Sequence, residues 1–235
     1  MASLVLLHES HLNATNPGQK PVVGWRASNQ GIGAIHNPMG FAMTRIVHLN
    51  DAGEPMYDQI QLIENAGAIV LPVMGDRIGL IHAWRPTAER LVDAGSEYIR
   101  RLEEEGRWSE LTATLGQWHW EAPRGLAPSS VKGEDLENYI LRTAKLEAAE
   151  EAGFTIANAR IVGRVNMNTT FFAHAQYVVG ADVVEIGDKN PEDLEVIGNV
   201  RFFDLEELRG LNQTGEFVCG STLAAMALCG LSLPE

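Results

Sequence analysis

The chain has 235 residues, of which 45% are hydrophobic, and its 18 basic and 31 acidic residues give a formal net charge of −13. The hydrophobic fraction predicts a folded chain with a sizeable core rather than a disordered one. The acidic balance argues against a nucleic-acid partner or an anionic membrane surface, since both favour a basic footprint, although a local metal site can still attract a phosphorylated small molecule.

Signals for targeting and for redox chemistry are weak. The N-terminal apolar run at residues 4–7 is too short for a signal peptide, and no apolar stretch is long enough to span a membrane. Cys219 and Cys229 lack the spacing of metal ligands, so we expect both to be small buried residues in a protein of the reducing cytoplasm.

The first half of the chain predicts two pairs of strands. These strands are expected at 41–49, 56–63, 66–73 and 78–84. The first pair belongs to a small N-terminal β-subdomain at 1–64. Charged, amphipathic residues at about 87–117 predict a helical insertion in the larger domain at 65–235.

The second half alternates strands and helices. The elements expected there are a strand at 118–121, a helix at 135–152, strands at 159–166, 171–179 and 195–203, and helices at 204–209 and 221–231. Gly153 is expected to end the longest helix as its C′ residue. Mixed strands with helices on both sides predict an α/β sandwich.

Three glutamates lie at the C-terminal end of the helix predicted at 135–152. On a wheel with about 100° per residue, Glu147, Glu150 and Glu151 fall on or beside the apolar stripe. Like charges at these spacings repel, the helix dipole disfavours them, and burial of an unpaired carboxylate is costly. A hard divalent cation would offset these penalties. The alternative interpretation is a solvated acidic helix end.

The residues around these glutamates resemble a known motif. Residues 144–154 resemble the second half of the Nudix box, Arg-Glu-U-x-Glu-Glu-x-Gly-U, where U is apolar. The matching positions are Glu147, Glu150, Glu151, Gly153 and Phe154. Residues 120–125, Trp-Glu-Ala-Pro-Arg-Gly, resemble the segment that opens the box in the ADP-ribose pyrophosphatase branch, and the resemblance extends over roughly 40–230.

The resemblance implies a Nudix-type α/β/α sandwich with a mixed sheet and a metal-dependent site. Glu147, Glu150 and Glu151 would bind Mg²⁺ or Mn²⁺, together with the backbone carbonyl of Arg124, and Glu147 and Glu151 would act in catalysis. A general base is expected in the late acidic loop, where Glu192 is the first candidate and Glu195 the second. The alternative for this loop is a solvated acidic turn.

Three further residues are candidate substrate contacts. Arg85 matches an arginine that contacts substrate phosphate in this branch, and its alternative role is a surface salt bridge. Arg124 points either to phosphate or to solvent. Trp25 stacks on a nucleobase or packs in the core.

The box is degenerate in two respects. Leu146 replaces the arginine that pairs with a box glutamate in the family. In addition, 22 positions separate Gly125 from Glu147 where the family pattern has 15, so the loop before the helix is longer. Glu134 is a candidate for the displaced first glutamate, in which case the helix gains about one turn.

These features predict hydrolysis of a nucleoside diphosphate linked to another moiety, such as ADP-ribose or a nucleotide sugar, by attack of water at phosphorus. The resemblance also implies a homodimer, with no nucleic-acid or membrane partner. The alternative function is a catalytically weak or inactive Nudix-like domain that binds a nucleotide or a protein, which Leu146 and the lengthened box favour.

Overall fold

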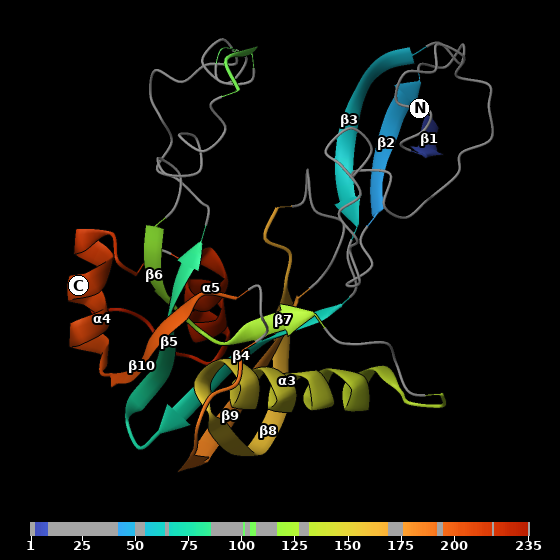
Figure 1. The fold of residues 1–235 in the computed structure, drawn as a ribbon. Coiled ribbons are helices and arrows are strands. Elements are labelled where there is room, and N and C mark those ends of the chain that lie inside the picture. The colour runs from blue at the N-terminus through green and yellow to red at the C-terminus, as the bar shows by residue number, and fades with distance from the viewer. Residues whose placement is uncertain are drawn as a thin grey trace.

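The computed structural model describes residues 3–8, 42–49, 55–63, 66–85, 101, 104–106, 117–126, 132–168, 176–191, 195–217 and 219–234. Within these ranges the chain forms a three-stranded sheet, a seven-stranded sheet and three helices (Figure 1). None of these helices is long and apolar enough to cross a membrane.

The smaller sheet comes from the N-terminal part of the chain. It consists of β1 (Ser3–His8), β2 (Ala42–Leu49) and β3 (Pro55–Ile63), which pair antiparallel in the order β1-β2-β3. The predicted strands at 41–49 and 56–63 are confirmed to within one residue at each end. β1 was not predicted, because its apolar run is short and is followed by polar residues.

The larger sheet holds the core of the protein. Its strands are β4 (Gly67–Met74), β5 (Arg77–Arg85), β6 (Gln117–Glu121), β7 (Arg124–Leu126), β8 (Phe154–Val165), β9 (Gln176–Ile186) and β10 (Ile197–Phe203). Five strands follow the order β10-β5-β4-β9-β8. Only β4 and β9 pair in parallel, so the sheet is mixed, as predicted.

The short strands β6 and β7 fill a gap between β4 and β5. β4 and β5 pair with each other only beside their turn, at Val73↔Ile78 and Met74↔Arg77. Beyond that point β6 pairs with β5 and β7 pairs with β4. The connection between them is also bonded to the sheet, because the Val70 N–H donates to the Pro123 carbonyl at 2.9 Å. The segment 117–126 is therefore held between two central strands.

Helices cover both faces of the larger sheet, which makes an α/β/α sandwich (Figure 1). α3 (Leu136–Ala152) packs on one face, and α4 (Leu205–Thr214) and α5 (Gly220–Leu228) pack on the other. Side chains alternate along β4, so that Ala68 and Val70 face α3 while Ile69 and Leu71 face the other helices.

Both ends of α3 have clear signals. The Asp135 side chain accepts a hydrogen bond from the Asn138 N–H, an N-cap that stabilises a helix by about 1 kcal/mol. Gly153 ends the helix in the left-handed region, with φ at 69°, and its N–H reaches carbonyls of the last turn. No basic residue lies in that last turn, so nothing on the helix itself compensates the acidic residues there.

Several boundaries differ from the sequence prediction. β8 begins at Phe154, five residues before the predicted start, because register shifts and a positive φ at Asn158 carry the strand through a turn-like stretch. β9 continues to Ile186, and the predicted start of that strand at 171–175 lies outside the described residues. α4 continues to Thr214, five residues past the predicted end. Cys219 and Cys229 are free and only partly buried, so the expectation that both are buried residues was wrong.

Other expectations fall mainly on parts of the chain that are not described. These include Trp25, Glu192 and most of the insertion at 87–117. The two sheets come from residues 3–63 and 67–203, while the division into domains at residue 64 stays a prediction.

Two glycines offer a test of how tightly the core is packed. A Cβ at Gly79 would lie 2.7 Å from Phe154 Cε2 and 3.0 Å from Phe202 Cε1. We therefore expect Gly79→Ala to lower the free energy of unfolding by about 1–3 kcal/mol, the range for overpacking, as measured by urea denaturation. Gly210→Ala in α4 is the control, since nothing lies within 4 Å of its Cβ. Equal stabilities for the two variants would contradict this packing.

Candidate functional site

Glu151 is a carboxylate inside the apolar face of α3. Its exposed fraction is 0%, and it lies among the buried residues of the helix, beside Ala148 and Ala152. Glu147 and Glu150 are half-buried. The helical wheel is thus confirmed for Glu151, and the alternative of a solvated helix end is wrong at this position.

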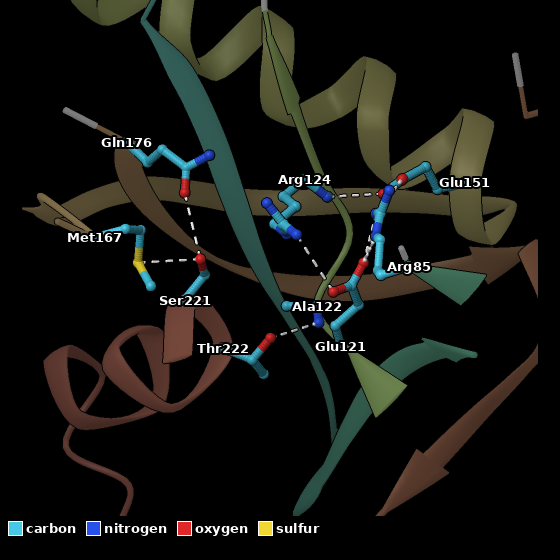
Figure 2. A network of polar contacts seen from close by, with 9 residues as sticks. All are labelled: Arg85, Glu121, Ala122, Arg124, Glu151, Met167, Gln176, Ser221 and Thr222. Atoms are coloured by element: carbon cyan, nitrogen blue, oxygen red, sulfur yellow. Dashed lines mark hydrogen bonds and ion pairs between the residues drawn. The ribbon is translucent and has the colours of Figure 1, made fainter. Parts of the chain in front are cut away.

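Two groups from strands of the larger sheet contact the Glu151 carboxylate (Figure 2). The backbone N–H of Arg124, at the start of β7, donates to Oε2 at 2.7 Å. The guanidinium of Arg85, at the end of β5, lies 3.8 Å from Oε1. Oε1 accepts no hydrogen bond from the described residues although it is buried. Glu151 is therefore only partly compensated by the protein.

Glu121 is a second buried carboxylate and was not predicted as a site residue. Its exposed fraction is 1%. Arg85 Nε donates to its Oε1 at 2.7 Å, and Arg124 reaches its Oε2 at 3.4 Å. Strand alternation could have indicated it, because Trp118 and Trp120 contact His82 on the opposite face and Glu121 must then face α3. Glu121 thus joins the two predicted substrate arginines.

Glu147 packs directly on the backbone of β7. A Cβ at Gly125 would overlap the carboxylate group of Glu147. Only glycine at this position lets β7 approach the helix so closely. The glycine and the glutamate that match the family motif are therefore in contact, although the loop between them is longer than the family pattern.

The late loop also reaches this region. The Asn190 N–H donates to the Glu150 carbonyl, and the Trp84 N–H donates to the Val196 carbonyl. These bonds hold the loop between the end of α3 and the end of β5. Glu195 lies in the described part of this loop, whereas Glu192 lies outside it.

The pKa of Glu151 is raised well above that of a free glutamate. Burial is the largest cause, followed by the negative charge of Glu195, and the charge of Glu147 adds to it. The hydrogen bond from Arg124 and the charge of Arg85 lower the pKa but do not outweigh these effects. Three carboxylates therefore interact electrostatically here, and additional positive charge would favour their ionised forms.

These residues fit a divalent cation. Glu151 Oε1 is a buried acceptor without a hydrogen-bond partner in the described part of the chain, and Glu147 and Glu195 act on it electrostatically. Carboxylate oxygens are the ligands that Mg²⁺ prefers. No group of three His, Cys, Asp or Glu side chains in the described ranges is already gathered at ligand distances, so the carboxylates would have to converge on the ion.

Arg142 forms an ion pair with Glu134, the residue expected from the sequence as the displaced first glutamate. Its Nε and NH2 groups donate to the two oxygens of Glu134 at 2.8 and 2.9 Å. Glu134 lies eight positions before Arg142, which is the spacing between the corresponding glutamate and arginine in the Nudix pattern. Because Arg142 precedes Leu146 by four positions, the pair is displaced by about one turn.

A cavity of about 280 Å³ lies away from these carboxylates. It is lined by β4, β8, β9, α4 and the segment after α5, and includes Arg160, Asp182 and Cys229. None of the predicted site residues lines it. We do not take this cavity as the functional site, because the buried carboxylates and the arginines paired with them lie on the α3 face of the sheet.

Comparisons with known proteins bear on the fold. Neither a protein-family model nor a curated protein sequence matches the chain. Among solved structures, one described as an ADP compounds hydrolase is 13% identical, with a TM-score of 0.52 over 90% of this chain and 93% of that one. At this identity the likeness shows the fold alone, a Nudix-like mixed α/β sandwich, as predicted.

The raised pKa of Glu151 leads to a prediction about stability. The folded chain binds the Glu151 proton more tightly than the unfolded chain, in which the pKa is about 4.3. Its contribution to stability is therefore complete below that value and is lost as the pH rises through the higher folded-state pKa. In chelator, the Tm of the parent should fall relative to that of Glu151→Gln as the pH rises above the unfolded-state value of about 4.3. Parallel Tm curves in thermal melts would contradict the buried, raised-pKa state.

Proposed function

We propose that the chain hydrolyses the phosphoanhydride bond of a nucleoside diphosphate linked to another moiety, such as ADP-ribose or a nucleotide sugar. The observation that carries the proposal is the buried Glu151 carboxylate beside two arginines on a Nudix-like fold. One oxygen of this carboxylate accepts no hydrogen bond from the residues that the structure describes. A carboxylate in this state favours a cation, and the guanidinium groups favour an anion. A metal–diphosphate substrate would satisfy both.

Glu147 and Glu151 are the proposed principal metal ligands, with Glu150 and the carbonyl of Arg124 as further ones. Bound Mg²⁺ or Mn²⁺ would neutralise part of the diphosphate charge and assist attack by water. Arg85 and Arg124 would bind and orient the phosphates, since planar guanidinium groups match phosphate oxygens well.

The base is proposed to come from the late loop. Glu192 is the first candidate and Glu195 the second. Support for Glu195 comes from its charge, which is the second-largest cause of the raised pKa of Glu151 and thus indicates proximity. A homodimer and a contribution of Trp25 to base stacking are parts of the same proposal that rest on the sequence resemblance.

A second candidate function is binding without hydrolysis. Arg85 already contacts both Glu121 and Glu151, and no three ligands are pre-gathered in the described ranges. Competition from Arg85 would weaken metal binding at Glu151. A domain of this kind would bind a nucleotide with or without metal and would not turn it over.

Turnover of a nucleotide panel separates the two functions. The panel holds ADP-ribose, nucleotide sugars, dinucleoside polyphosphates and nucleoside triphosphates, each with Mg²⁺ or Mn²⁺, and formation of the nucleoside monophosphate is measured by chromatography. We expect metal-dependent turnover of the nucleoside diphosphate derivatives. Glu151→Gln should lower kcat at least about 100-fold, because even outer partners of metal ligands cost about 10- to 100-fold.

Glu137→Gln is the matched control, since Glu137 is an exposed glutamate in the first turn of the same helix. Its turnover should equal that of the parent. The hydrolase proposal fails if no member of the panel is turned over, or if Glu151→Gln is as active as Glu137→Gln. Metal-independent nucleotide binding without turnover would favour the second function.

A further inference from the structure

We propose that Glu121 is a positioning residue that holds Arg85 and Arg124 side by side as a two-guanidinium seat for a diphosphate. The inference deepens the proposed function and rests on it for the identity of the natural substrate. It does not require the site to be catalytic, because an anion seat can be tested with a simple diphosphate.

The carboxylate of Glu121 bonds the guanidinium groups of both Arg85 and Arg124 (Figure 2). The Glu121 side chain is 2% exposed, whereas those of Arg85 and Arg124 are 26% and 27% exposed. Each oxygen serves a different arginine, with Oε1 bonded to Arg85 and Oε2 to Arg124. The buried carboxylate thus fixes the spacing of two guanidinium groups whose side chains are only partly buried.

Both arginines have N–H donors that are not directed to Glu121. A guanidinium has five N–H groups. Arg85 directs its Nε and one terminal nitrogen to Glu121, and Arg124 directs one terminal nitrogen there, while Arg124 Nε has no partner among the described residues. Glu121 bonds both guanidinium groups, and Glu151 lies 3.8 Å from that of Arg85. The remaining N–H donors of the two arginines suit an anion with two phosphate groups.

The rigid framework of the site supports a positioning role. Glu121 ends β6, Arg124 begins β7, and Arg85 ends β5, so all three are anchored on paired strands. The backbone of Arg124 is also fixed by its bond to Glu151. Without Glu121, the strands would remain, but the two arginines would lose the carboxylate that bonds both of them.

Charge and positioning make opposite predictions for Glu121→Gln. If Glu121 acted only through its charge, its neutralisation would make the cluster more positive and pyrophosphate would bind more tightly. If Glu121 orients the arginines, pyrophosphate binding should weaken about tenfold, in line with the loss of a charged hydrogen-bond framework. Calorimetric titration with inorganic pyrophosphate in chelator measures this without metal or turnover.

Glu121→Asp provides a second test that preserves the charge and favours retention of the fold. The shorter side chain cannot reach both guanidinium groups, so weaker pyrophosphate binding is again expected, whereas a purely electrostatic role predicts no change. Glu207→Gln is the control, since it breaks another Arg–Glu pair, with Arg201, and keeps the capping geometry of α4. It should bind pyrophosphate like the parent.

The outcomes separate this inference from the hydrolase proposal. Pyrophosphate binding by the parent that weakens in both Glu121 variants supports the seat, even if no nucleotide is hydrolysed. Unchanged or tighter binding in Glu121→Asp overturns it, even if the parent is an active hydrolase. Absence of pyrophosphate binding at millimolar concentration by the parent overturns it as well.

Discussion

The burial of one carboxylate governs the organisation of this site. Glu151 occupies a position on α3 that would otherwise belong to an apolar residue, since its neighbours on that face are fully packed. An ionised group in such a place must be paired or bonded, because its desolvation costs several kcal/mol. The helix offers no basic partner in its last turn, so compensation has to come from elsewhere in the fold.

The segment 117–126, which contains β6 and β7, supplies part of the compensation for the Glu151 charge. This segment brings Glu121 and Arg124 between the central strands and places the Arg124 N–H against Glu151. The same segment is tied to the opposite layer, because the Ala122 N–H donates to the Thr222 hydroxyl of α5 at 2.9 Å (Figure 2). The carboxylate site is thus built on a segment fixed to the sheet and to helices on both of its faces.

Local features were predictable from the sequence. The period of the apolar residues located α3, Gly153 marked its end, and the position of Glu151 on the wheel indicated its burial. Resemblance to a family motif then gave the fold, although the structural neighbour is only 13% identical. The signals for the helix and for the burial of Glu151 each lie within about twenty consecutive residues. The signal for the fold lies in the order of such segments along the chain.

Contacts between distant segments were not predictable in the same way. Glu121 and Arg85 are 36 positions apart and meet only because β5 pairs with β6. Arg142 pairs with Glu134 one helical turn before Leu146, and pattern matching at fixed spacing around Leu146 could not detect this pair. The early start of β8 escaped prediction because its register shifts mimic a turn.

The function of the site depends most on whether Glu151 is buried to bind a metal ion or only to form an ion pair. The direct measurement is titration of Mn²⁺ into the parent and Glu151→Gln, with free Mn²⁺ followed by electron paramagnetic resonance. If Glu151 is a metal ligand, the parent should bind Mn²⁺ saturably and Glu151→Gln should show a large loss of affinity. Equal Mn²⁺ binding by the two proteins, or none by the parent, would contradict it.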